Sequence, residues 1–190
     1  GVPAEIQQFA QAAIAAHPPT VIYAAPLHYH LLTASAAVPA TALPRVRLAL
    51  STTMRLPPDT ATAFSRKFGF APAEAYGIIE VGLPFINLHP ETALPGCVGH
   101  ALPDYQLRLD QPDADGVGEV LLRGPGLFDA YYSPWQPRAI ALANGWFRTG
   151  DLGRIAPDGS LILVGRNKSV IVHAGLKIFP EEVETILNTH

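Results

Sequence analysis

The feature that most constrains the fold is an alternation of helical and strand patterns over the first 76 residues. Apolar residues recur at helical spacing over residues 3–16, and after two prolines residues 20–25 have the pattern of a buried strand. The alternation continues with helices expected over residues 27–36 and 59–68 and strands over residues 47–50 and 71–76. Asp59 is the expected cap of the second of these helices. Alternating elements of this length favour an α/β fold, a parallel sheet covered by helices.

Past about Pro95 the pattern changes to strands bounded by turns. Strands are expected over residues 105–110, 118–123, 159–164 and 169–173, with a short helix near residues 137–143. Pro180 then begins a helix, because Glu181, Glu182 and Glu184 suit the positive end of a helix dipole. We therefore expect an α/β part over residues 1–94, a β-rich subdomain over 95–166 and a third part over 167–190.

Composition excludes several classes of protein. The net charge is −3 and the 13 Lys and Arg residues form no basic run, so no nucleic-acid partner is expected. The longest apolar stretches, such as residues 161–164, are far shorter than the roughly 20 residues of a membrane helix, so no membrane span is expected. Cys97 is the single cysteine, which excludes an internal disulfide and fits a cytoplasmic location.

The segment Thr149-Gly150-Asp151 carries the best candidate for a ligand-binding side chain. It has the pattern of a tight turn that ends in a carboxylate, and a carboxylate can accept two hydrogen bonds from a vicinal diol such as ribose. Taken alone, the same residues are more typical of an Asx turn between strands, since Asp favours turns. The surrounding sequence decides between the two interpretations.

The longest motif runs from Gly145 to Glu184. It contains Gly-Trp-Phe-Arg-Thr-Gly-Asp-Leu-Gly, then Asp-Gly, then Gly-Arg-Asn-Lys, then Gly-Leu-Lys-Ile-Phe-Pro-Glu-Glu-Val-Glu. In order and spacing this resembles the adenylate-forming superfamily, which includes acyl-CoA synthetases, nonribosomal adenylation domains and luciferases. The resemblance covers essentially the whole chain and is closest to bacterial acyl- or aryl-acid ligases.

The resemblance implies roles for four residues of this motif. Asp151 is expected to hold both ribose hydroxyls of ATP, and Arg166 to reach the same sugar and the nearby phosphate. Lys168 matches the hinge about which a small C-terminal domain rotates between adenylation and thioester formation. Gly175 matches a loop beside the pantetheine arm of the thiol acceptor.

A second segment, Ala75-Tyr76-Gly77-Ile78-Ile79-Glu80, resembles the Tyr-Gly-x-Thr-Glu loop of the same superfamily. The resemblance implies that Tyr76 packs on adenine beside Gly77 and that Glu80 binds Mg²⁺. Such roles suit an aromatic face and a hard oxygen ligand. Ile79 stands where the superfamily has a Thr hydroxyl at the α-phosphate, so this chain departs from the pattern at one nucleotide contact.

A third segment, residues 50–57, matches a small glycine-containing turn that lines the adenine and acyl pocket. The pocket residues implied are Ser51, Thr52, Thr53 and Ala75, and Thr53 and Met54 are bulkier than the residues usual there. His28 and His30 lie two apart in a predicted helix and point to different sides, so a metal site is not expected. His28 and Tyr29 instead match a helix that lines the acyl pocket.

These matches predict part of an ATP-dependent carboxylic acid ligase, which forms an acyl-adenylate and then a thioester with CoA or with the phosphopantetheine of an acyl carrier protein. The superfamily's phosphate loop would lie upstream of Gly1 and its distal Lys beyond His190. We therefore expect an internal part of a larger enzyme, assign no catalytic residue, and expect the isolated chain to be inactive. One alternative is a non-catalytic relative that keeps a nucleotide or acyl cleft or an interaction surface, which Ile79 and Thr53 favour. Another is an α/β scaffold whose matches are only structural.

Overall fold

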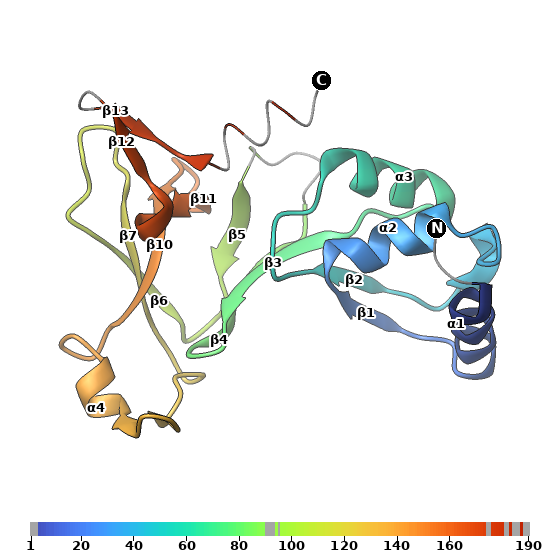
Figure 1. Ribbon diagram of the computed structural model, residues 1–190, viewed down its shortest axis with the longest axis horizontal. Coiled ribbons are helices and arrows are strands. Elements are labelled where there is room, and N and C mark those ends of the chain that lie inside the picture. The colour runs from blue at the N-terminus through green and yellow to red at the C-terminus, as the bar shows by residue number, and fades with distance from the viewer. Residues whose placement is uncertain are drawn as a thin grey trace. The chain divides into compact units, whose positions relative to one another are not determined.

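The computed structural model describes residues 4–89, 94, 96–173, 176–180, 183 and 187 (Figure 1). Its Cα positions divide into two units, each described by itself below. The first comprises Gly1–Tyr76 and Asn87–Ala93, and the second comprises Gly77–Ile86 and Leu94–His190. No helix within the described residues is long and apolar enough to cross a membrane.

The first unit follows the helix and strand alternation of the sequence. In chain order its elements are α1 (Ala4–Ala16), β1 (Val21–Ala24), α2 (Pro26–Ala34), the 3-10 helix η1 (Ala40–Ala42), β2 (Leu48–Ser51), α3 (Pro58–Phe68) and the start of β3 (Ala73–Ile78). β1 pairs with β2 and β2 with β3, both in parallel, with Val21 opposite Leu48 and Leu50 opposite Ala73. The predicted parallel, helix-covered α/β layer is therefore confirmed.

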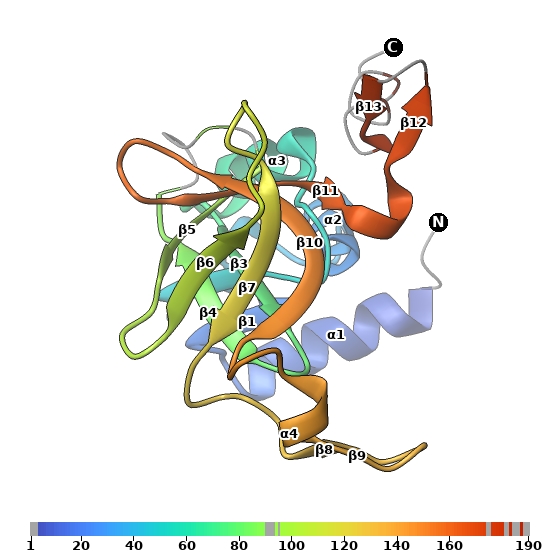
Figure 2. The same cartoon turned by 90° about the vertical axis from the view of Figure 1, so that its left-hand side faces the viewer.

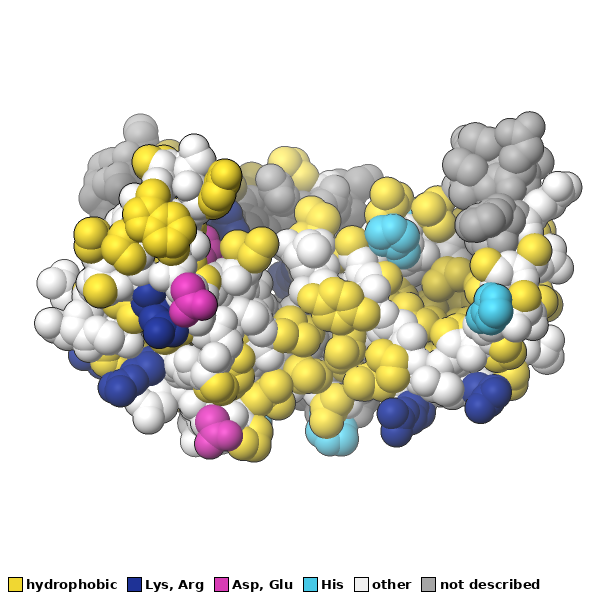
Figure 3. Space-filling model, turned by 90° about the horizontal axis from the view of Figure 1, so that it is seen from below, with side chains coloured by type: hydrophobic (Ala, Val, Ile, Leu, Met, Phe, Trp, Pro, Cys, Tyr) yellow, Lys and Arg dark blue, Asp and Glu magenta, His cyan; other side chains and the backbone are white. Residues whose placement is uncertain are grey.

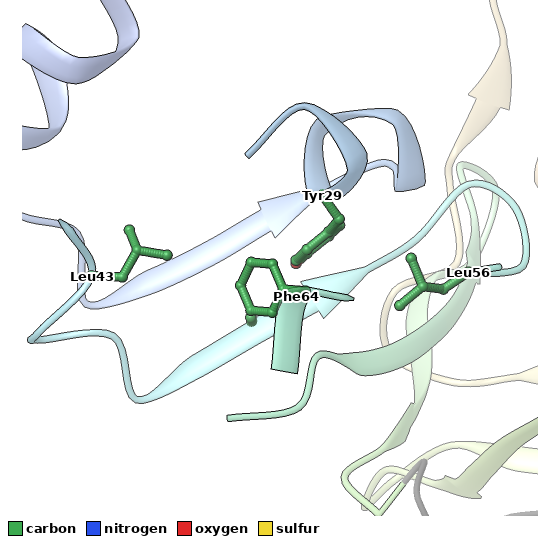
Figure 4. Packing of buried hydrophobic residues seen from close by; sticks show 5 residues of the cluster. Tyr29, Leu43, Leu56 and Phe64 are labelled. Atoms are coloured by element: carbon green, nitrogen blue, oxygen red, sulfur yellow. The ribbon is translucent and has the colours of Figure 1, made fainter. Parts of the chain in front are cut away.

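The core of this unit lies where α2 and α3 pack on the sheet (Figure 4). Tyr29 and Phe64 are fully buried and meet edge to face, with ring centroids 5.1 Å apart. Leu43, Ala49 and Leu56 complete the buried cluster. The aromatic pair adds a directional contact to the burial of apolar area. Because Tyr29 lies in this core, it does not have the pocket-facing position expected from the sequence.

Two local expectations for this unit are wrong. β1 is not buried, because Val21 and Tyr23 are 42% and 60% exposed while Ile22 and Ala24 face the core cluster. Helices cover only the face of β1 that carries Ile22 and Ala24, so the alternate side chains lie in solvent. Asp59 does not cap α3 either: Pro57 occupies the cap position without a side-chain bond, and Asp59 lies in the first turn. There its charge suits the helix dipole.

The second unit is rich in strands, as expected. Its larger elements are β4 (Gly82–Asn87), β5 (Cys97–Ala101), β6 (Gln106–Asp110), β7 (Gly118–Arg123), β10 (Phe147–Ile155) and β11 (Leu161–Arg166). They lie in the order β4-β5-β11-β10-β7-β6 with antiparallel neighbours. Figure 2 shows β7 and β10 curving strongly side by side. In the described residues this order is open at β6, so the expected distorted barrel is not closed.

Short elements complete the second unit. They are β8 (Ala130–Tyr131), β9 (Gln136–Pro137), α4 (Arg138–Ala141), the 3-10 helix η2 (Asn167–Ser169), β12 (Ile171–His173) and β13 (Leu176–Ile178). Sequence periodicity identified β6, β7, β11, β12 and the short helix, with small shifts of their bounds, but not β4, β5 or β10. The helix expected from Pro180 falls mostly outside the described residues, as do Glu181, Glu182 and Glu184. Lys and Arg side chains are scattered over the face in Figure 3, without a continuous basic patch there.

Candidate functional site

Residues 149–151 form a bulge in the middle of β10. β10 pairs with β7 at Phe147 and Arg148, loses register, and pairs again from Leu152 onward. Gly150 has a φ of 74°, a left-handed conformation that favours glycine. The predicted tight turn at Thr149-Gly150-Asp151 is therefore a bulge within a strand. Bulges of this kind re-aim a side chain relative to the regular strand.

Side chains replace the missing backbone partners at the bulge. The Asp151 N–H donates to Thr149 Oγ1 over 3.0 Å, and the Thr149 hydroxyl donates to the Val120 carbonyl over 2.8 Å. The Gly150 N–H donates to Glu119 Oε1 over 3.2 Å. The amides of Gly150 and Asp151 are thus satisfied, as backbone donors removed from water require.

Asp151 and Arg166, two of the residues singled out by the sequence, are brought together by strand pairing. They lie opposite each other on β10 and β11, and Arg166 Nε donates to Asp151 Oδ1 over 3.0 Å. The Asp151 side chain is 8% exposed and the Arg166 side chain 69% exposed. A nearly buried carboxylate beside an exposed cation is suited to accept hydroxyl donors while the cation reaches an anionic group.

The segment with Ile79 and Glu80 forms the turn between β3 and β4. The Val81 N–H donates to the Ile78 carbonyl over 3.0 Å, and a Cβ at Gly77 would collide with the Gly82 carbonyl oxygen. Ile79 is 93% exposed at the tip of the turn. Only glycine fits at position 77, which explains why this residue type follows the aromatic ring of the motif.

Glu80 is held at this turn by the segment that follows β7. Its backbone carbonyl accepts from the Phe128 N–H over 2.9 Å, and its Oε1 accepts from the Tyr131 hydroxyl over 2.9 Å. The Phe128 and Tyr131 rings are in contact, with centroids 4.6 Å apart. Glu80 is half-buried, so its carboxylate keeps some exposure to solvent and its position permits contact with a ligand.

The predicted adenine and acyl pocket residues lie in the first unit. Ser51 and Thr52 are buried, and Thr52 N–H donates to the Ala24 carbonyl over 3.1 Å. Thr53 is exposed and has a φ of 77°, while Ala75 and Tyr76 are each 8% exposed on β3. Within the described residues the buried Ser51 hydroxyl has no hydrogen-bond partner. The four pocket residues therefore lie on neighbouring strands and the loop that follows.

The Glu80 carboxylate fits Mg²⁺ in the manner that the resemblance implies. Magnesium takes one or two protein carboxylates beside phosphate oxygens, and Glu80 offers a single half-buried one. The described residues hold no group of three or more His, Cys, Asp or Glu side chains that could bind a metal ion. A hollow of about 310 Å³ between α2 and α3 is lined by His30, Asp59 and Thr60 among others, and no predicted nucleotide residue lines it.

Two further predicted residues have less defined surroundings. Lys168 is exposed in η2, directly after β11, a position at the end of an element that suits a hinge. Gly175 lies outside the described residues. Sequence reasoning missed Glu119 and Tyr131 as partners of the site. Glu119 lies in the strand expected over residues 118–123, without a signal of its own there, and Tyr131 carries no local signal.

Comparison with known proteins tests the family resemblance that the motifs indicate. The sequence profile of the family described as AMP-binding enzyme matches residues 2–132. An indoleacetate–CoA ligase of Aromatoleum aromaticum is 40% identical over 97 residues, which are 48% of this chain and 19% of that protein. An oxalate–CoA ligase of Arabidopsis thaliana is 33% identical over 171 residues, which are 86% of this chain and 33% of that protein.

A solved structure shows the same fold. The ATP-bound crystal structure of MatB from Rhodopseudomonas palustris superimposes with a TM-score of 0.80 at 28% identity. The match covers 97% of this chain and 38% of that chain. The chain thus spans about a fifth to a third of the curated relatives and somewhat more of the solved structure.

Proposed function

Because the chain belongs to the family of AMP-binding enzymes, we propose that it is part of an ATP-dependent carboxylic acid ligase. The carboxylate of the acid attacks the α-phosphorus of ATP, pyrophosphate leaves, and an acyl-adenylate forms. The thiol of CoA then attacks the acyl carbon, AMP leaves, and a thioester forms. An acyl carrier protein is the alternative thiol donor, and a cytoplasmic location suits both acceptors.

The pairing of Asp151 with Arg166 is the observation that carries this proposal. Asp151 accepts from the two ribose hydroxyls through a carboxylate that is nearly buried and therefore little hydrated. Arg166 is anchored to it at 3.0 Å and keeps most of its guanidinium surface exposed for the phosphate side of the nucleotide. Strand pairing sets Asp151, at the bulge of β10, directly opposite Arg166 on β11.

The remaining assignments follow the resemblance. Tyr76 packs against adenine, with Ser51, Thr52, Thr53 and Ala75 on the adenine or acyl side. Glu80 is the Mg²⁺ ligand, and the ion supplies charge neutralisation at the phosphates when bound. We assign residues 1–94 and 95–166 to the large domain, Lys168 to the hinge, and Gly175 to the side of the thiol acceptor.

The proposal is tested with Asp151→Asn in the enzyme that contains this chain. We expect the KM for ATP in ATP–pyrophosphate exchange to rise about tenfold or more, because an amide presents one acceptor and a donor where the ribose needs two acceptors. Asp158→Asn, in the turn of the same β10–β11 hairpin, is the matched control, and its exchange kinetics stay unchanged. Equal kinetics for both variants would contradict the ribose assignment. The gene sequence on either side of the chain is a second test.

Ile79 favours a second candidate, a relative that binds a nucleotide or acyl ligand without turnover. Its apolar side chain is 93% exposed where the resemblance implies a hydroxyl at the α-phosphate. If the site is catalytic, Ile79→Thr adds a hydrogen bond to a charged group, worth about 1.5–3 kcal/mol, and raises the exchange rate by about tenfold or more. Ile79→Val is the matched control, since it adds no hydroxyl. No exchange with either the parent or the Thr variant would support the non-catalytic candidate.

A further inference from the structure

The bulge of β10 needs support that its own backbone does not provide. Regular pairing with β7 stops after Arg148 and resumes at Leu152, so Gly150 and Asp151 lie where the register of the β7–β10 ladder is interrupted. Gly150 also adopts a left-handed conformation. A bulge without other partners would leave buried donors unpaired, and a shift of register would turn Asp151 toward the other face of the sheet.

Glu119 on β7 supplies the first support. Its side chain is 12% exposed, and its two oxygens have different partners. Oε1 accepts from the Gly150 N–H, and Oε2 pairs with the Arg148 guanidinium. Arg148 also pairs with Asp110 on β6 over 2.6 Å, a contact that does not involve the bulge. The carboxylate of Glu119 thus contacts the bulge itself at Gly150 and the residue just before it, Arg148.

Thr149 supplies the second support. Its hydroxyl donates to the Val120 carbonyl on β7 and accepts from the Asp151 N–H, so one side chain spans the gap that the bulge opens. The contacts of Glu119 and Thr149 fall on consecutive amides, Gly150 and Asp151. Together they tie the bulge to β7 at the residue that faces Arg166 on the other neighbouring strand.

We propose that Glu119 and Thr149 are positioning residues that hold the β10 bulge and so aim the Asp151 carboxylate at the ribose hydroxyls of the nucleotide. The aiming of Asp151 at ribose rests on the function proposed above, whereas the support of the bulge does not. Neither residue contacts the nucleotide in this account. Each acts through the backbone of residues 150 and 151.

The test uses this chain and two readouts, amide hydrogen exchange measured by NMR and titration with AMP. Glu119→Ala and Thr149→Val remove the two supports, while Thr149→Ser keeps the hydroxyl. Asp110→Asn is the matched control, because Asp110 touches Arg148 but not the bulge. We expect the Gly150 amide in Glu119→Ala and the Asp151 amide in Thr149→Val to exchange at least about tenfold faster. Both variants weaken AMP binding about tenfold or more, because the Asp151 carboxylate is displaced from the ribose hydroxyls.

The expected results for Thr149→Ser and Asp110→Asn are amide exchange and AMP binding within about twofold of the parent chain. Unchanged exchange in Glu119→Ala and Thr149→Val would overturn the supporting role, and so would an equal effect of Asp110→Asn. Faster exchange with unchanged AMP affinity would overturn the aiming of Asp151 but not the function. Faster exchange in a chain whose parent form does not bind AMP would count against the proposed function while the support of the bulge stands.

Discussion

At the scale of single residues, Thr53 is the position whose side chain fits its backbone least well. Its φ of 77° lies in the left-handed region, which a β-branched residue rarely adopts, and the loop at this point matches a glycine-containing turn. Thr53→Gly relieves a strain of roughly 1–2 kcal/mol and adds an entropy cost of roughly half that. We expect a net stabilisation of about 0.5–1 kcal/mol in chemical denaturation.

The neighbour Met54 provides the control for this prediction, because it is exposed and its backbone is not in the left-handed region. Met54→Gly has only the entropy cost and is expected to destabilise the fold by several tenths of a kcal/mol. If both glycine variants shift the denaturation midpoint in the same direction, Thr53 is not strained.

Glu74 on β3 gives a pH-dependent prediction. Burial raises the pKa of its carboxyl above the ordinary 4.5, and the charge of Arg55 opposes part of the rise. The folded chain thus binds the proton more tightly than the unfolded chain, so this contribution favours folding at low pH and is lost as pH rises through the folded pKa. Glu74→Gln is therefore expected to raise the melting temperature at pH 7, and the gain disappears well below pH 4.5.

Asp158 is a control of opposite sign for the pH measurement. Hydrogen bonds from the Ser160 backbone and hydroxyl hold the pKa of Asp158 below its ordinary 3.8. Stability from this group is present above the unfolded pKa and lost as pH falls through the folded pKa. Asp158→Asn should therefore lower the melting temperature at pH 7. A lower melting temperature for both variants at pH 7 would contradict the prediction for Glu74.

At the scale of elements, Lys67 of α3 closes the carboxyl end of α2. Its Nζ donates to the carbonyls of Leu32, Thr33 and Ser35 over 2.8, 3.2 and 2.8 Å. These bonds satisfy carbonyls that the end of a helix leaves without partners, and the cation suits the negative end of the dipole. Lys67→Met keeps the aliphatic stem but leaves the carbonyls unpaired, so we expect a loss of about 1–3 kcal/mol in urea unfolding.

Arg66 is the matched control, since it lies in the same last turn of α3 but is exposed. Arg66→Met removes the same formal charge, and we expect a change within about 0.5 kcal/mol. Equal losses for the two variants would mean that charge, and not the contact with α2, accounts for the effect of Lys67.

At the scale of the whole molecule, the division of the chain into two units predicts separate responses to a core mutation. Phe64 is fully buried and contacts Tyr29, Phe68 and Phe70 with ring centroids 5.1, 4.7 and 5.4 Å away. Phe64→Ala is expected to cost about 3–5 kcal/mol. We expect NMR signals of the first unit to broaden or disappear while the amides of the β10 bulge stay protected.

Phe64→Leu is the milder control for this measurement, because it keeps most of the apolar volume and is expected to leave both units folded. Simultaneous loss of the β10 amides in Phe64→Ala would show that the two units unfold as one cooperative body.

The sequence by itself determined the features that depend on short-range periodicity and on motif residues. Helical spacing gave α1 and α3 within a few residues, and the strand pattern at residues 118–123 coincides with β7. Motif order picked out Asp151 and Arg166, which the structure pairs at 3.0 Å. Local patterns suffice for these features because hydrogen bonds within a helix, and alternation along a strand, involve near neighbours in sequence.

Only the tertiary structure decided how those residues are held. The segment at Thr149 has the sequence of a turn, yet it lies inside β10, because β7 and β11 provide partners on both sides. Glu119 reaches Gly150 from 31 positions away in the chain. The exposure of Tyr23 and the burial of Tyr29 depend likewise on which face of the sheet the helices cover. Strand register and helix packing join distant segments, and their energies have no signature in the local order of residues.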